Sequence, residues 1–210
     1  MEQACTHITV ILDRTGSMES IKDDVIGGFN SFLETQRATP GRATLTLVQF
    51  DSQDPFEVVY SRKDINDAPP LTAASYIPRA STPLLDALGR GMADLDAAIA
   101  ASSADTRPDK VIFAVVTDGM ENASREFSRA AIQQMIDERK ARGWQFVFLS
   151  ADLDAVEEAR HLGFSEKQRR LYEKETPGVQ RMFRDMSVAV NDYRSGRRRE
   201  VELPDEEENA

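Results

Sequence analysis

The chain has 210 residues, of which 40% are hydrophobic, and a formal net charge of −10. It is long enough to bury one sizeable core, and its acidic balance argues against a general affinity for nucleic acid, which requires clustered Lys and Arg. Its single cysteine excludes an intrachain disulfide and a thiolate zinc cluster. The chain lacks a run of roughly 20 apolar residues, and its first residues, MEQACTHITV, lack a leader pattern, so we expect a soluble, cytoplasmic protein with no membrane partner.

The first half of the chain alternates strand and helix patterns. Ile8–Leu12 is a continuous apolar run, which is typical of a strand buried on both faces. Between Ile21 and Leu33 apolar residues recur at helical spacing, with Gly28 on the same face, where we expect a close approach to the sheet. The other elements predicted here are an alternating strand over Thr44–Phe50, a strand over Phe56–Ser61 expected to be an antiparallel edge, and a helix from Pro83 to Ile99.

The second half continues this alternation and ends in a charged segment. Its predicted elements are a buried strand over Val111–Val116, a helix between Asn122–Ser124 and Gly143, a buried strand over Phe146–Leu149, a helix over Asp152–Leu162, a short strand within Gln168–Lys174 and a helix from Thr176 to Tyr193. Residues 197–210, RRREVELPDEEENA, combine a basic run, a proline and an acid-rich end, and we expect a disordered tail there. The sequence thus predicts a single domain over residues 1–196.

The order of these elements predicts an α/β fold. Strands that alternate with helices imply right-handed crossovers and a doubly wound, mostly parallel sheet between helices on both faces. In such a sheet ligands bind beyond the carboxyl ends of the strands, where the strand order reverses. We therefore expect the chemistry of this protein at that edge.

Acids and hydroxyls follow the central strands at this edge. Asp13, Thr15 and Ser17 come directly after the first strand, Asp118 follows the strand over 111–116, and Thr82 begins a helix that must start at the same edge. Crowded carboxylates repel one another, and a bound divalent cation reverses that penalty. Two carboxylates with three hydroxyls offer only oxygen, which suits Mg²⁺ or Mn²⁺, and we favour Mg²⁺. Taken singly, Ser17 and Thr82 could instead be helix caps, and each aspartate an ordinary strand-end acid.

Three stretches carry a resemblance to a known family. In this order, VILDRTGSM, STPLLDAL and VIFAVVTDGMENAS resemble the von Willebrand factor type A (VWA) domain and its metal-ion-dependent adhesion site (MIDAS), over about Ile8 to Tyr193. The resemblance implies a Rossmann-like sheet with Mg²⁺ held by five residues, in which a threonine replaces the family's commoner first serine. These residues are Asp13, Thr15, Ser17, Thr82 and Asp118.

The resemblance also implies a function. In this family the ion typically binds an Asp or Glu carboxylate of a partner protein, and the module is adhesive and not catalytic. Stand-alone bacterial members that resemble this chain often act beside separate proteins, including ring-forming ATPases. A protein partner is therefore expected.

Three other functions stay open on the residues alone. A haloacid-dehalogenase-like phosphatase also places an aspartate after its first strand and uses Mg²⁺, but it usually has a second aspartate two residues later, where this chain has Thr15. Nucleotide binding is disfavoured because no phosphate-binding glycine loop follows a strand. A structural scaffold with an unused site is the third.

Several residues near these motifs receive an interpretation from their position. Asp51, Glu121 and Asn122 either surround the metal ligands or are loop and cap residues, and the second is favoured. Tyr76 or Arg79, in YIPRASTP, is expected to contact a partner. The residues expected to have no part in the site are Trp144 in the core, and His7 and His161.

Overall fold

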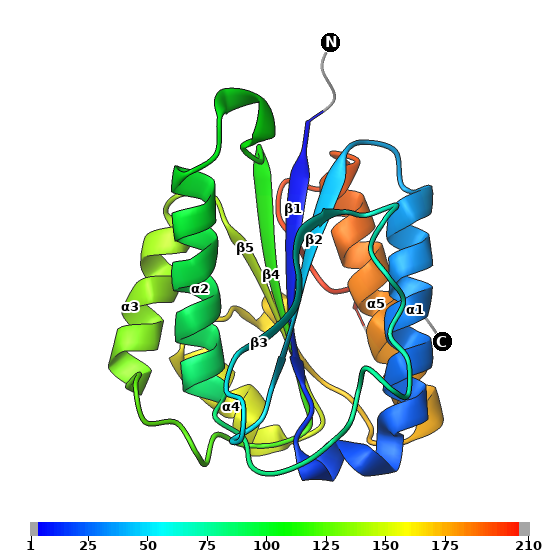
Figure 1. The fold of residues 1–210 in the computed structure, drawn as a ribbon, viewed down its shortest axis with the longest axis vertical. Helices are drawn as coiled ribbons and strands as arrows, with labels where there is room; N and C mark the ends of the chain where they lie inside the picture. Colours follow the sequence, from blue (N-terminus) through cyan, green and yellow to red (C-terminus); the bar gives the residue numbers. More distant parts are fainter. Residues whose placement is uncertain (1–3, 206–210) are drawn as a thin grey trace.

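A six-stranded sheet with the order β3-β2-β1-β4-β5-β6 forms the centre of the computed structural model, which describes residues 4–205 (Figure 1). The strands are β1 (Thr6–Asp13), β2 (Ala43–Phe50), β3 (Glu57–Asp64), β4 (Lys110–Thr117), β5 (Gln145–Ser150) and β6 (Arg169–Leu171). All neighbours pair parallel except β2 and β3, so the predicted antiparallel edge strand is confirmed. The order reverses between β1 and β4, the two strands at the middle of the sheet.

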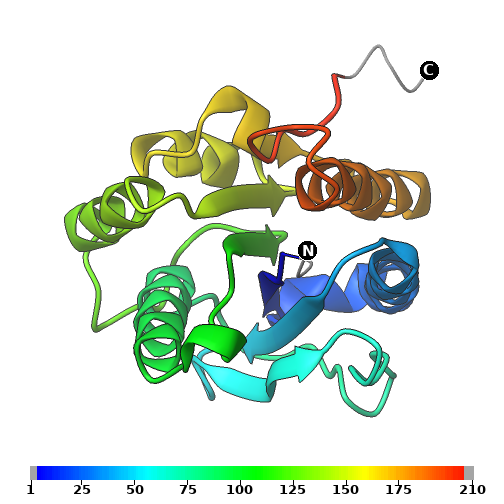
Figure 2. The same cartoon turned by 90° about the horizontal axis from the view of Figure 1, so that it is seen from above.

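Helices cover both faces of the sheet (Figures 1 and 2). On one face α1 (Lys22–Ala38) packs against α5 (Thr176–Arg194), and the other face is covered by α2 (Leu84–Ala100) and α3 (Arg129–Lys140), with α4 (Leu153–His161) beside β5 and β6. Alternate strand residues enter the two layers, as Val10 and Ile11 do. This burial on both faces confirms the doubly wound α/β fold and explains the continuous apolar runs. Within residues 4–205, no helix has both the length and the apolar character needed to cross a membrane.

The contact between α1 and α5 requires a residue without a side chain. A Cβ atom at Gly28 would lie 2.1 Å from Cδ2 of Phe183 in α5. At the adjacent Gly27, nothing lies within 4 Å of the corresponding position. The sequence predicts that Gly28 brings its helix close to the sheet, whereas in the structure it brings α1 close to α5.

The third predicted helix begins later than its pattern indicates. α3 starts at Arg129, with Ser128 as its cap, and not at residues 122–124. The carboxylate of Glu121 accepts the N–H groups of residues 123 and 124 at 2.9 and 2.7 Å, and that of Asp86 accepts those of residues 125–127 at 2.8–3.0 Å. Because the nearby Glu121 and the distant Asp86 bind these amides, the segment forms a loop against the start of α2.

The expected disordered tail is partly folded. Val201 and Leu203 are buried in the same apolar layer as α1 and α5. Their N–H groups donate to Oε1 of Gln145 at 3.0 Å and to the carbonyl oxygen of Lys167 at 2.9 Å. The prediction of disorder is therefore wrong for this part of the segment, because two apolar side chains between its charges find places in the core. Residues 206–210 lie outside the described part of the chain.

Candidate metal centre

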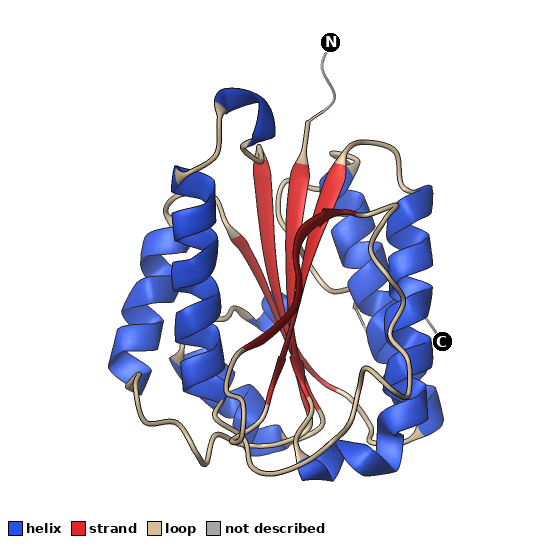
Figure 3. Cartoon of the chain, in the orientation of Figure 1, coloured by secondary structure: helices blue, strands red, loops and turns tan. Residues whose placement is uncertain are grey.

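The residues predicted to bind a metal lie at one end of the sheet, where the carboxyl ends of the parallel strands meet a group of loops (lower end in Figure 3). Asp13 is the last residue of β1, and Asp118 follows β4 directly. The two strands between which the order reverses therefore supply both carboxylates. Thr15 and Ser17 lie at the turn into a 3-10 helix over Gly16–Ile21, and Thr82 comes just before α2.

Asp13 is completely buried, and both of its carboxylate oxygens accept hydrogen bonds. Oδ1 accepts the N–H of Thr15 at 2.6 Å, and Oδ2 accepts the hydroxyl of Thr117 at 2.5 Å. Burial raises the pKa of Asp13 to about 7 against the opposing effect of these hydrogen bonds, and the negative charge of Asp118 adds to the increase. A cation beside this carboxylate would favour its ionised form, as expected of a metal ligand.

Two hydroxyls connect the loop after β1 to the loop after β4. The hydroxyl oxygens of Thr15 and Ser17 lie 3.2 Å apart, and Ser17 donates to Oδ1 of Asp118 at 2.7 Å. The Asp118 side chain is fully buried, and its Oδ2 lies 2.6 Å from Nζ of Lys174, in the loop between β6 and α5. Ser17 itself is exposed, so the cluster reaches solvent there.

Thr82 is tied by its backbone to the loop that follows Asp118. Its N–H donates to Oδ1 of Asn122 at 2.9 Å, and its carbonyl oxygen accepts the N–H of Asn122 at 3.0 Å. The first turn of α2 is capped by Glu121 and Ser124, which accept from the amides of residues 85 and 86 at 2.9 and 3.0 Å. The interpretation of Ser17 and Thr82 as helix caps is therefore wrong, since neither side chain makes a capping hydrogen bond.

The donor set fits a small, hard divalent cation. It consists of two carboxylates and three hydroxyls, and so offers only oxygen. Among residues 4–205, no group of three or more Asp, Glu, His or Cys side chains is placed to hold a metal ion. Arg14, next to Asp13 in the sequence, forms ion pairs with Asp51 and Glu57. Of the two carboxylates at the site, Asp118 is paired with Lys174, and a divalent ion would balance the negative charge that remains.

A buried carboxylate behind the site holds two loops together. Asp51 has no exposed surface, and its Oδ2 accepts from Nε of Arg14 at 2.6 Å and from Nε of Arg79 at 2.9 Å. Burial opposes ionisation, but the Arg79 and Arg14 side chains and two backbone amides together lower the pKa of Asp51. Asp51, like Glu121 and Asn122, thus holds loop segments together, and Asn122 does so at Thr82, one of the predicted ligands.

Of the two candidates for partner contact, Tyr76 lies inside the protein, next to the proposed metal ligands. It is fully buried, and its hydroxyl donates to the carbonyl oxygen of Asp13 at 2.6 Å. Arg79 donates its N–H to the carbonyl oxygen of Arg14 at 2.8 Å, while its side chain is 40% exposed. Of the two, only Arg79 reaches the surface.

Two residues at the site are not predicted by the sequence motifs. Thr117 is the last residue of β4, and its hydroxyl donates a hydrogen bond to the carboxylate of Asp13. Lys174 follows β6, whose carboxyl end reaches the same edge as β1 and β4 because these strands are parallel. The rule that located the aspartates could have found this lysine, but a strand of three residues gives a weak pattern.

Comparisons with known proteins bear on the fold. No protein-family model and no curated protein matches the chain. Among solved structures, proximal thread matrix protein 1 from the mussel byssus, with zinc in its MIDAS motif, matches with a TM-score of 0.62 and 12% identity, over 90% of this chain and 46% of that one.

Two bacterial structures match in the same way. The pilus adhesin SpaC from Lactobacillus rhamnosus GG, in its open conformation, has a TM-score of 0.66 and 14% identity, over 91% of this chain and 30% of that one. A von Willebrand factor type A protein from Catenulispora acidiphila has a TM-score of 0.59 and 14% identity, over 89% of this chain and 42% of that one. This chain spans less than half the length of each of these proteins, and the likeness is one of fold.

Proposed function

We propose that this chain, which has the fold of von Willebrand factor type A domains, is a divalent-metal-dependent module that binds another protein. The ion, which we take to be Mg²⁺ with Mn²⁺ as a substitute, would be held by Asp13, Thr15, Ser17, Thr82 and Asp118. The observation that carries the proposal is the pair of buried carboxylates at the ends of the two central strands, with Asp13 bound to the N–H of Thr15 and Asp118 bound to the hydroxyl of Ser17. A neighbour in fold with zinc in its MIDAS motif supports this assignment.

The partner would contribute an Asp or Glu carboxylate. Two carboxylates and three hydroxyls balance the charge of a divalent ion but need not fill its coordination shell, and Mg²⁺ commonly completes that shell with water or an acidic group. When bound, the ion would act as a Lewis acid that links the two proteins. The chain's own residues orient the ligands: Tyr76 and Thr117 fix Asp13, and Ser17 fixes Asp118. A cytoplasmic protein such as an ATPase would suit this role.

The proposal includes no catalytic activity. A phosphatase of the haloacid-dehalogenase type usually has a second aspartate two residues after the first, as acid and base, where this chain has Thr15. We expect no turnover of p-nitrophenyl phosphate with Mg²⁺. Hydrolysis that disappears in Asp13→Asn would instead establish an enzyme.

Calorimetric titration of EDTA-stripped protein with MgCl₂ and MnCl₂ tests the metal site. We expect one site, weakened at least about tenfold in Asp118→Asn and in Thr82→Val, a loss of about 1.4 kcal/mol. Asp105→Asn is the matched control, because Asp105 precedes β4 and so lies at the opposite end of the sheet. Circular dichroism verifies that each variant is folded. Unchanged affinity in both site variants would refute the assignment.

Two further measurements test the partner's carboxylate. Protein-bound Mn²⁺ should enhance water-proton relaxation, and an acidic ligand should reduce this enhancement by displacing water. Pull-downs from the host lysate, in Mg²⁺ and in EDTA, would then compare the wild type with Thr82→Val. A protein retained only by the wild type in Mg²⁺, and lost when one of its own acidic residues is replaced, is the expected result. Identical retention in EDTA would contradict metal-dependent binding.

A further inference from the structure

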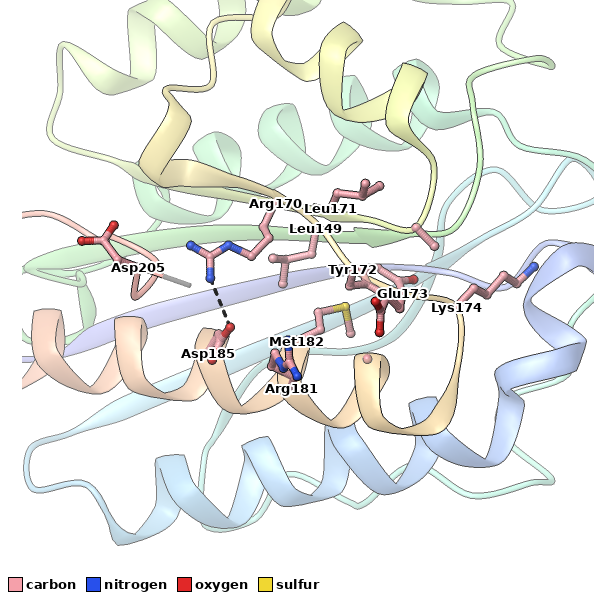
Figure 4. A pocket seen from close by; sticks show the side chains of 12 residues that line it. Leu149, Arg170, Leu171, Tyr172, Glu173, Lys174, Arg181, Met182, Asp185 and Asp205 are labelled. Atoms are coloured by element: carbon pink, nitrogen blue, oxygen red, sulfur yellow. Dashed lines mark hydrogen bonds and ion pairs between the residues drawn. The ribbon is translucent and has the colours of Figure 1, made fainter. Parts of the chain in front are cut away.

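A lysine ammonium group reaches the proposed metal site from a third segment of the chain. Nζ of Lys174 lies 2.6 Å from Oδ2 of Asp118 and donates to the carbonyl oxygen of Ser17 at 2.7 Å. Figure 4 shows its side chain extending from the end of the pocket beside β6 and α5 toward the blue ribbon near the start of the chain. One positive charge therefore bridges two of the segments that carry the proposed ligands.

The loop that carries Lys174 is anchored on both sides. Before it, the buried hydroxyl of Tyr172 donates to the carbonyl oxygen of Thr117 at 3.0 Å. After it, the hydroxyl of Thr176 donates to Oδ2 of Asp24 in α1 at 3.0 Å. Because the anchors stand two positions away on either side, the backbone keeps the ammonium group within reach of Asp118.

The turn into α5 is also tight. A Cβ atom at Gly178 would lie 2.1 Å from the carbonyl oxygen of Glu173, so that this turn excludes a side chain. The path of the chain on either side of Lys174 is thus set by close packing. Its side chain is only 34% exposed, although lysine is ordinarily one of the most exposed residues.

A metal ion bound through Ser17 and Asp118 would stand beside this ammonium group. Two positive charges a few ångströms apart repel one another strongly where water is partly excluded. We propose that Lys174 is a built-in competitor of the metal: its ammonium group occupies the site in the metal-free protein and must leave Asp118 for the ion to bind. This inference rests on the proposed function, and it identifies the residue that sets the metal concentration at which partner binding begins.

Calorimetric titration with MgCl₂ of three lysine variants tests the competition. Lys174→Met removes the charge but keeps most of the side-chain length, and we expect Mg²⁺ to bind about tenfold more tightly than to the wild type. Lys174→Arg keeps the charge and should stay within about twofold of the wild type. Lys167→Met is the matched control, because Lys167 is an exposed lysine paired with Glu202 at 3.3 Å.

Acetylation by a succinimide ester, followed by mass spectrometry, gives a readout that does not depend on affinity. Saturating Mg²⁺ should raise the reactivity of Lys174 severalfold and leave that of Lys167 unchanged. Binding to the wild type with no gain of affinity in Lys174→Met, or with no change in reactivity, would overturn the inference alone. Absence of Mg²⁺ binding in both the wild type and Lys174→Met would overturn the proposed function, and the inference with it.

Discussion

His7 is a buried titratable residue near the start of β1, at the other end of this strand from the proposed metal site. Its ring nitrogens lie 2.8 and 3.1 Å from the hydroxyl oxygens of Thr44 and Thr9, and it has no exposed surface. Burial, with the positive charge of Arg62, lowers its pKa from 6.5 to about 3. The unfolded chain therefore binds more protons than the folded chain between these values. The stability that His7 contributes is complete above pH 6.5 and is lost as the pH falls toward 3.

His7→Gln should therefore flatten the acid branch of the stability curve. Between about pH 4 and 6, we expect the free energy of unfolding of the wild type to fall by up to about 1.4 kcal/mol per pH unit more than that of the variant. Urea denaturation at several pH values measures this difference. His161→Gln, at an exposed histidine of α4, is the control. Parallel curves for the wild type and His7→Gln would contradict the prediction.

Thr15 offers a test of a single oxygen ligand. It is buried, with its hydroxyl oxygen 3.2 Å from that of Ser17. Thr15→Ser keeps the hydroxyl and should leave Mg²⁺ affinity within about threefold, whereas Thr15→Val keeps the shape and should lower affinity at least about tenfold, or about 1.4 kcal/mol. Calorimetry distinguishes the two. Equal affinity in Thr15→Val and the wild type would remove Thr15 from the ligand set.

At the scale of elements, the packing of α1 on α5 provides a matched pair of substitutions. Gly28→Ala would place a Cβ atom 2.1 Å from the Phe183 ring and should lower the free energy of unfolding by about 1–3 kcal/mol, as overpacking usually does. Gly27→Ala meets no neighbour within 4 Å and should raise it by up to about 1 kcal/mol, because alanine favours helix. Chemical denaturation compares them. Equal changes in the free energy of unfolding in the two variants would show that α1 and α5 move apart to accommodate the added methyl group without cost.

Elements held by local patterns could be predicted from the sequence. Central strands buried on both faces give unbroken apolar runs, and Trp144 is buried as expected. The start of α3 could not be predicted, because the carboxylates of Asp86 and Glu121 bind the amides that would otherwise have begun the helix. Asp86 is remote in sequence from the amides that it binds, so no local pattern contains this contact.

That Asp13, Thr82 and Asp118 lie at one edge of the sheet could be predicted from the order of the strands and helices. Parallel strands bring their carboxyl ends to one edge, so the topology alone fixes which loops meet. The same rule applies to Lys174, but β6 is only three residues long, so that its pattern is weak and its direction is clear only once it is paired with β5.

At the scale of the whole molecule, residues 201–203 cover the sheet near β5 and β6. Leu203 is 3% exposed although it stands in a strongly charged stretch, whose composition predicted disorder. Leu203→Ala should lower the free energy of unfolding by about 2–5 kcal/mol, the usual cost of such a truncation in a core. Arg199→Ala, at an exposed neighbour, should change it by less than about 0.5 kcal/mol. Urea denaturation of both variants provides the measurement. A decrease in the free energy of unfolding that is no larger in Leu203→Ala than in Arg199→Ala would show that burial of Leu203 does not stabilise the fold.

The strand order also determines when the centre of the sheet can form during synthesis. β1 is made before its partner β4, which begins only at Lys110, after β2, β3 and α2. Until β4 leaves the ribosome, one edge of β1 has no strand to pair with, and Asp13 lacks both the Thr117 hydroxyl and its companion Asp118. The centre of the sheet and the proposed metal site are therefore completed by the same event. A chain that has not yet made β4 has neither.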